Sequence, residues 1–221
     1  MRKIGIFLAL LAFLLFVFLG FHVAELFSTA GVGQSGNLAA TAGEQQYNFL
    51  IVHVDQLDSD HPALISVWVA FTYLADPASI SFLPIYPTNR NGEMDLAAHF
   101  SLSKEKTIST AFLEQLQKEY NLQWSHVVMI DQKGASYWTR FLTGAEFSQT
   151  LDSDNQTLLK PEIDLLGSLC SALRERGSGV LTGLEWNQVI PDHLRTDISL
   201  DQVIGEWDRI QKSGLCDVFG Q

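Results

Sequence analysis

The sequence lacks the residue patterns that mark several common enzyme classes. Only two of its 221 residues are cysteine, and no Cys-x-x-Cys spacing occurs, which excludes a zinc ribbon or a thioredoxin-like redox centre. It also has no Gly-x-Ser-x-Gly nucleophile elbow and no phosphate-binding P-loop. Both cysteines, Cys170 and Cys216, adjoin apolar residues in surroundings that we predict to be helical. We expect buried free thiols there; a disulfide in an oxidising compartment is the alternative.

Basic residues are scarce as well. The chain has 14 Lys and Arg against 25 Asp and Glu, and its formal net charge is −11. Outside residues 1–27, 12 basic residues face 24 acidic ones. Phosphate contacts need clustered Lys and Arg, so we expect no nucleic-acid partner. An excess of one charge sign keeps a soluble domain dispersed, which is the simpler explanation of the acidity.

One long apolar run stands near the N-terminus. Residues 4–21 form eighteen positions without a charged side chain, and Arg2 and Lys3 precede them. A helix of that length reaches across a hydrocarbon core of about 30 Å. Positive residues stay on the cytoplasmic side, so the remainder of the chain is expected outside. We therefore predict a single-pass anchor at 1–27 in the cell membrane, with an extracytoplasmic C-terminal domain.

A cleaved signal peptide is the competing interpretation of this segment. Its apolar region would span only about 7–15 residues, whereas the run here is longer, which favours a retained anchor. Residues 28–46 are small and polar, with repeated Gly, Ala and Ser, and predict a flexible linker. The folded domain is then expected over 47–221.

The rest of the pattern predicts an α/β fold with a mixed central sheet flanked by helices on both faces, an αβα arrangement. The first three expected strands are rich in apolar, β-branched and aromatic residues, and a short turn pairs the second and third as a hairpin. The fourth strand follows a helix and is expected to be parallel to a neighbour. Strands are expected at 49–54, 63–73, 79–85 and 125–131, and helices at 104–120, up to Gly144, from Pro161 to Gly177, and after Ser199.

Carboxylates gather after the first expected strand. Asp55, Asp58 and Asp60 lie in one loop at its carboxyl end, and in open α/β sheets ligands bind at that edge. Oxygen ligands suit a hard cation such as Mg²⁺. A solvated polar loop is the alternative. Histidines are scattered without a helical i, i+4 pair, and His53, within the first strand, is expected to be a satisfied core residue.

The order of these segments resembles the LytR-CpsA-Psr family. The similar stretches are the apolar strand ending at Asp55, the Ser-Asp-His segment around Asp60 that leads into the second strand, the third strand ending at Pro84, and the later helix, strand and Gly144. The likeness covers roughly residues 47–210. It implies phosphotransferase chemistry, in which a glycopolymer moves from a polyprenyl pyrophosphate carrier to a cell-wall acceptor with the help of Mg²⁺ and arginines.

The arginines of that family do not carry over. Gln56, Leu57 and Asp58 fill the loop where the family has an arginine, and residues 146–160 contain one Lys and no Arg. Among the remaining arginines, Arg90 is the one expected near the site. The resemblance thus implies a remnant site of Asp55, Asp58, Asp60 and Arg90, with Asp55 and Asp60 as Mg²⁺ ligands.

Three functions follow as hypotheses. The favoured one is a non-catalytic binding or accessory module of the cell envelope, because a pyrophosphate leaving group needs cations that this chain lacks. Its partner would be a polyprenyl-linked glycan or a cell-envelope protein. The second is an active glycopolymer transferase with a rearranged site around Asp55 and Asp60. The third is an unrelated anchored scaffold.

Overall fold

The computed structural model describes residues 46–87, 96–149 and 155–219. The predicted anchor at 1–27, the linker up to 45 and Arg90 lie outside these ranges. The elements are β1 (Gln46–Val54), β2 (Leu64–Tyr73), β3 (Ser79–Tyr86), α2 (Leu96–His99), α3 (Thr110–Tyr120), β4 (His126–Asp131), α4 (Gln132–Thr143), α5 (Asn155–Arg176), α6 (Gly179–Thr182), the 3₁₀ turn η1 (Trp186–Gln188), β5 (Leu194–Thr196), α7 (Leu200–Ser213) and β6 (Leu215–Val218).

The strands form one mixed sheet in the order β5-β4-β1-β2-β3-β6. The predicted hairpin is confirmed, since β2 pairs with β3 in antiparallel register. The parallel placement of the fourth strand is confirmed too, since β4 lies parallel to β1. The central strands of the sheet are therefore those with the longest apolar runs, and the carboxyl ends of β1 and β4 share one edge.

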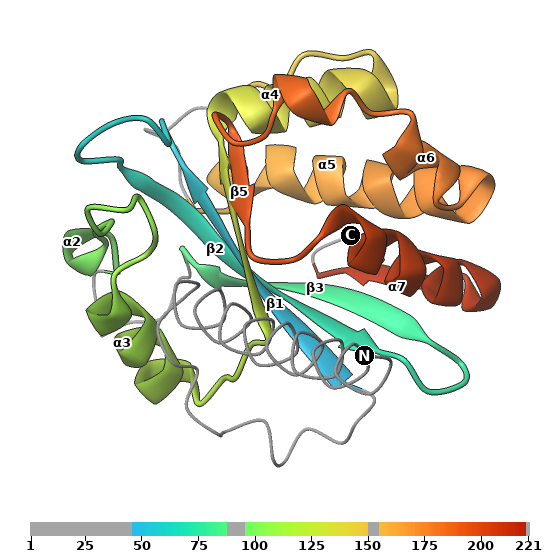
Figure 1. The fold of residues 1–221 in the computed structure, drawn as a ribbon, viewed down its shortest axis with the longest axis horizontal. Helices are drawn as coiled ribbons and strands as arrows, with labels where there is room; N and C mark the ends of the chain where they lie inside the picture. The colour runs from blue at the N-terminus through green and yellow to red at the C-terminus, as the bar shows by residue number, and fades with distance from the viewer. Residues whose placement is uncertain (1–45, 88–95, 150–154, 220–221) are drawn as a thin grey trace, which may run out of the picture. The chain divides into compact units, whose positions relative to one another are not determined.

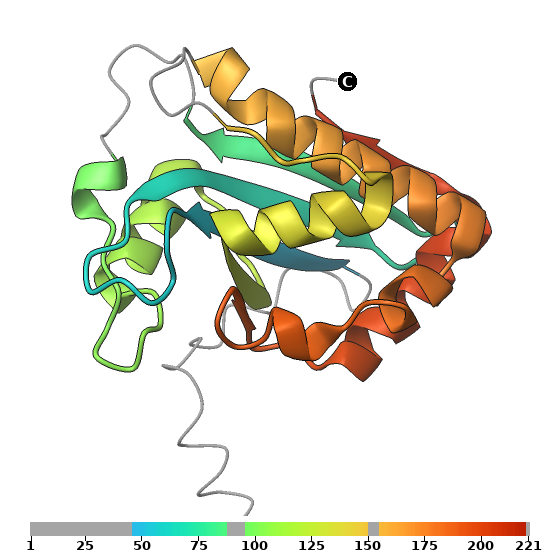
Figure 2. The ribbon, with the colours of Figure 1, turned by 90° about the horizontal axis from the view of Figure 1, so that it is seen from above.

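Helices cover both faces of the sheet, as the sequence predicts (Figure 1). One face packs against α4, α5, α6 and α7, with Trp68 of β2 and Trp207 of α7 in the same core. The other packs against α2 and α3, with Val52 of β1 facing Phe112 of α3. Figure 2 shows α4 and α5 running side by side along their face. The described residues therefore have the αβα arrangement that the sequence predicts.

Two predicted helix starts are wrong. The helix expected from 104 begins at Thr110, because the Ser109 side chain caps it and the polar segment before it turns back on itself through a Ser103 to Thr107 backbone bond. The helix expected from Pro161 begins at Asn155 and continues through the proline. Gly144 as a helix end and the capping box from Ser199 are confirmed.

The expectation of free cysteines is also wrong. Cys170 of α5 and Cys216 form a disulfide, with Cα atoms 5.5 Å apart. Cys216 lies in the edge strand β6 and not in a helix, so the two residues approach from different layers. The disulfide fastens the second half of α5 to the edge of the sheet.

None of the helices within the described ranges is long and apolar enough to cross a membrane.

Candidate functional site

The loop after β1 is organised by the first of its carboxylates. One oxygen of Asp55, Oδ1, accepts hydrogen bonds from the backbone N–H groups of Gln56 and Ala63, both at 2.7 Å. The Asp55 N–H in turn donates to the Ala63 carbonyl at 3.0 Å. The Asp55 side chain thus closes the 55–63 loop. Because Oδ1 is engaged in these hydrogen bonds, only the second carboxylate oxygen of Asp55 is left for a ligand.

The other two carboxylates of the loop lie at the surface. Asp60 has a side chain that is 92% exposed and accepts from Lys106 Nζ at 2.9 Å. The same ammonium donates to the Ser59 carbonyl at 2.9 Å and approaches the Asp58 carbonyl at 3.4 Å. The hydrogen bond from Lys106 and its positive charge lower the pKa of Asp60. Lys106, which the sequence did not nominate, is therefore the cation of this loop.

These residues make a poor donor set for the Mg²⁺ that the resemblance implies. Asp55 has one oxygen engaged by its own loop, and a cation at Asp60 would compete with the Lys106 ammonium. Within the described residues, no three His, Cys, Asp or Glu side chains are grouped to hold a metal ion. Magnesium at Asp55 and Asp60 stays a prediction.

A buried polar cluster joins β1 and β2 to α5 near the carboxyl end of β1. The Glu162 carboxylate of α5 points into the sheet, where Oε1 is 2.5 Å from His53 Nδ1. Its Oε2 accepts from Ser66 Oγ at 2.6 Å and from Trp68 Nε1 at 2.5 Å. Gln149 Nε2 donates to Oε1 at 3.1 Å and to the Leu158 carbonyl at 2.9 Å. Four donors from β1, β2 and the connection before α5 thus converge on one carboxylate.

The cluster keeps Glu162 ionised despite its burial. Burial raises the pKa of this carboxyl, but the hydrogen bond and positive charge of His53, with the bonds from Ser66 and Trp68, outweigh it and hold the pKa below the usual 4.5. His53 is a core histidine, as expected, at 2% exposure. Its Nε2 is nevertheless without a hydrogen-bond partner in the structure, so it is only half satisfied.

A second histidine–carboxylate pair holds the adjoining edge of the sheet. Asp131, at the end of β4, accepts from His193 Nδ1 at 2.9 Å, from the Gly134 N–H at 2.9 Å and from the Leu57 N–H at 3.4 Å. It therefore caps α4 and also ties the 55–63 loop to β4. The candidate site thus lies at the carboxyl ends of two parallel strands, β1 and β4. This is the edge where ligands bind in open α/β sheets.

The three carboxylates lie in the loop after β1, where the sequence places them, and Glu162 is not among the residues that the sequence nominates. A signal was available: Leu159, Glu162 and Leu166 recur at helical spacing, which puts the acid on the apolar stripe of α5. A charged residue on such a stripe needs partners, since an unpaired buried charge is costly. Its partners in β1 and β2 are far away in sequence, so only the fold reveals them.

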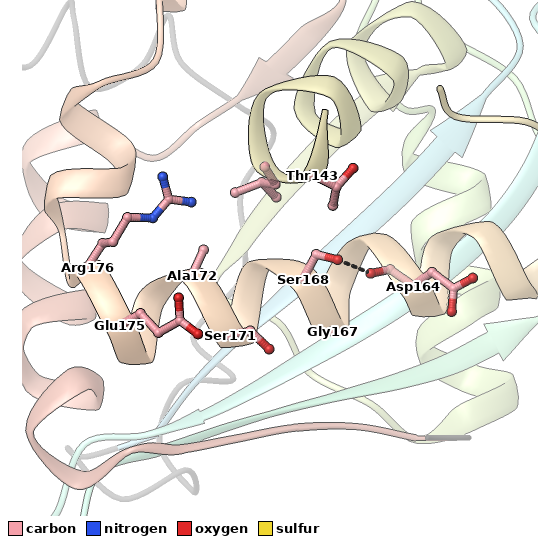
Figure 3. A pocket seen from close by; sticks show the side chains of 9 residues that line it. Thr143, Asp164, Gly167, Ser168, Ser171, Ala172, Glu175 and Arg176 are labelled. Atoms are coloured by element: carbon pink, nitrogen blue, oxygen red, sulfur yellow. Dashed lines mark hydrogen bonds between the residues drawn. The ribbon is translucent and has the colours of Figure 1, made fainter. Parts of the chain in front are cut away.

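A surface groove of about 550 Å³ lies elsewhere, between the end of α4 and the second half of α5. Figure 3 shows Thr143 of α4 facing Ser168 and Arg176 of α5 across it. Ser168 Oγ donates to the Asp164 carbonyl at 2.7 Å. The groove contains none of the residues that the sequence nominates.

Solved structures share this arrangement of sheet and helices. B. subtilis TagV is 9% identical, with a TM-score of 0.54 over 79% of this chain and 84% of its own. The chain has a LytR-CpsA-Psr-like fold. Protein gbs0355 of Streptococcus agalactiae is 10% identical, with a TM-score of 0.55 over 83% of this chain and 79% of its own. TagT, solved bound to LI-WTA, is 8% identical, with a TM-score of 0.52 over 80% and 79%.

No family model and no curated protein matches the sequence. At these low identities the likeness concerns the LytR-CpsA-Psr-like fold and does not extend to activity. The chemistry of the site must therefore be argued from the side chains of this chain. Those residues are a loop with half-buried Asp55 and exposed Asp60, and a buried carboxylate, Glu162, beside His53 of β1.

Proposed function

We propose that the chain is a membrane-anchored, extracytoplasmic, non-catalytic binding or accessory module of the cell envelope. Its partner would be a polyprenyl-linked glycan or a cell-envelope protein. Two findings support this: the LytR-CpsA-Psr-like fold, and the likeness to TagT, whose solved structure is bound to LI-WTA. The likeness to TagT suggests the class of ligand, and the side chains of this chain argue against turnover.

The main support for a non-catalytic role is that the Glu162 carboxylate of α5 points into the sheet, toward His53. The resemblance expects arginines in the stretch before α5, where they would meet the negative charge of a pyrophosphate. This chain has no arginine from 146 to 160, and α5, which begins within that stretch, turns the Glu162 carboxylate toward His53, two residues before Asp55. The carboxylate and its histidine form a mutually neutralised buried pair that offers no cation to the anion that a transferase must stabilise, and lack of cationic contacts costs orders of magnitude in rate.

The disulfide is consistent with an outside location. Disulfides form and persist in extracytoplasmic, oxidising compartments and are rare in the cytosol. Cys170 and Cys216 are both buried, at 1% and 6% exposure, so the bond belongs to the packed interior. Together with the apolar run at 4–21, it favours an anchored domain that folds outside the cytoplasm.

Binding of a lipid-linked glycan by the full chain in nanodiscs tests the proposal. The probe is a polyprenyl pyrophosphate carrying a short saccharide, and the readout is its retention on the chain against nanodiscs alone. We expect saturable binding that is independent of Mg²⁺. Retention no better than for the empty nanodiscs, combined with failure to capture any envelope protein after crosslinking in cells, would refute the binding role.

A further inference from the structure

An ammonium group lies among oxygen atoms at the tip of the 55–63 loop. Lys106 Nζ donates to the Ser59 carbonyl at 2.9 Å and to the Asp60 carboxylate at 2.9 Å. The Asp58 carbonyl accepts from the same nitrogen at 3.4 Å. A lysine ammonium has three N–H donors and no acceptor, so all three donors are directed at the loop. Lys106 is therefore occupied by the protein itself and does not offer an N–H group to a ligand.

The backbone of Lys106 is in a conformation that lysine rarely adopts. Its φ angle is 58°, in the left-handed region where a Cβ is disfavoured and glycine is preferred. The residue lies in a turn, in which its N–H donates to the Ser103 carbonyl at 3.0 Å and the Ser103 N–H donates to the Thr107 carbonyl at 2.7 Å. A lysine at such a position costs free energy that glycine would not, so its side chain is expected to have a task. The contacts of the ammonium indicate what that task is.

The same residue is held from the edge of the sheet. Arg195 of β5 donates from Nη1 to the Lys106 carbonyl at 3.2 Å and from Nε to the Pro191 carbonyl at 3.1 Å. A lysine side chain is a flexible four-carbon stem, so the ammonium reaches one place only if the backbone that carries it is fixed. Arg195 supplies part of that fixation and thereby links β5 to the loop after β1.

The oxygens around the ammonium are of the kind that hold a hard cation. Carbonyl and carboxylate oxygens are the ligands that Ca²⁺ and Mg²⁺ take in proteins, and two carbonyls and one carboxylate surround Lys106 Nζ. The side chain of Lys106 is 32% exposed, whereas that of Asp60 is 92% exposed, so the ion pair alone is screened by solvent and contributes little. The two carbonyl contacts are therefore the main means by which Lys106 fixes the loop.

We infer that Lys106 is a tethered cation that takes the place of a divalent metal ion at the 55–63 loop, so that the candidate site is formed without Mg²⁺. Asp55 closes the base of the loop, and Asp131 holds its side through the Leu57 N–H. Lys106 holds the tip. It is a positioning residue, because it contacts the loop and not a ligand. That the loop serves to bind a ligand rests on the proposed function, whereas the dependence of the loop on Lys106 does not.

Hydrogen–deuterium exchange of the 55–63 amides in the full chain tests this role with no ligand added. Lys106→Met keeps the length of the side chain and removes its charge and its donors. Lys104→Met is the matched control, since Lys104 is an exposed lysine in the same segment. We expect about fivefold faster exchange of the loop in Lys106→Met and unchanged exchange in Lys104→Met. Millimolar Mg²⁺ should leave the exchange of the wild-type loop unchanged.

Lys106→Gly separates the ammonium from the turn that carries it. Glycine suits a φ angle of 58°, so this variant removes the ammonium and relaxes the backbone. We expect the loop to exchange about as fast as in Lys106→Met. Wild-type exchange in either Lys106 variant, equally fast exchange in Lys104→Met, or protection of the wild-type loop by Mg²⁺ overturns the inference. The exchange measurement contains no glycan, so loop exchange as expected, together with no retention in the glycan-binding experiment, refutes the proposed function alone.

Discussion

The Glu162 carboxylate of α5 and the His53 imidazole of β1 meet at 2.5 Å in the interior of the domain. Both residues are almost fully buried, at 6% and 2% exposure. Ser66 and Trp68 of β2 complete the shell around the same carboxylate. This contact joins the first half of α5 to the sheet, and the disulfide joins the second half, so the helix is held at two separate points.

Removing the carboxylate should be strongly destabilising. Glu162→Ala leaves the donors of His53, Ser66 and Trp68 buried without an acceptor, and breaking a buried pair costs about 3–5 kcal/mol. Urea unfolding of the domain followed by tryptophan fluorescence measures the change. Glu146→Ala is the matched control, because its pair with Arg140 is exposed and should contribute less than about 1 kcal/mol. Equal effects of the two variants would contradict the role given to the cluster.

The same carboxylate should make stability depend on pH in a defined direction. The pKa of Glu162 is lower in the folded chain than its usual 4.5, so the stabilisation is fully present above that value and is lost as pH falls through the folded pKa. The difference in unfolding free energy between wild type and Glu162→Gln should therefore shrink as pH falls below about 4.5. A difference that grows on acidification would show that folding raises the pKa of Glu162 and does not lower it.

The strands and their order along the chain were predictable because buried strands carry continuous apolar runs. The capping box at Ser199 and the end at Gly144 were predictable because both are local signals. The edge strands β5 and β6 were missed, since three or four residues give no readable period. The partners of Glu162 in the sheet, His53, Ser66 and Trp68, were missed because they lie 94–109 residues away, a separation that no spacing rule reports.

A glycine in the first turn of α4 should be intolerant of substitution. A Cβ at Gly134 would overlap the His193 carbonyl oxygen and would lie 2.9 Å from Ile130 Cγ1. Gly134→Ala should cost about 1–3 kcal/mol through overpacking. Gly205→Ala in α7 is the opposite case, with open space around it, and should stabilise by about 0.5–1 kcal/mol. Thermal unfolding of both variants checks the contrast, and a neutral Gly134→Ala would argue against the tight contact between His193 and α4.

The disulfide should contribute measurably to stability. Cys170 and Cys216 are 46 residues apart, and closing a loop of that length restricts the unfolded chain by about 4 kcal/mol. The double variant Cys170→Ser/Cys216→Ser should therefore unfold at a lower urea concentration, by an amount that reduction of the wild type reproduces. If reduction leaves the unfolding midpoint unchanged, the bond does not restrain the chain.

Turnover is the most direct test of the central claim, that this LytR-CpsA-Psr-like domain binds without catalysing transfer. The full chain in nanodiscs is incubated with a polyprenyl pyrophosphate-linked saccharide, Mg²⁺ and a cell-wall acceptor, and the released polyprenyl phosphate is quantified. We expect release equal to that of nanodiscs without the chain. Release above that background that requires Mg²⁺ and disappears in Asp60→Ala would contradict it.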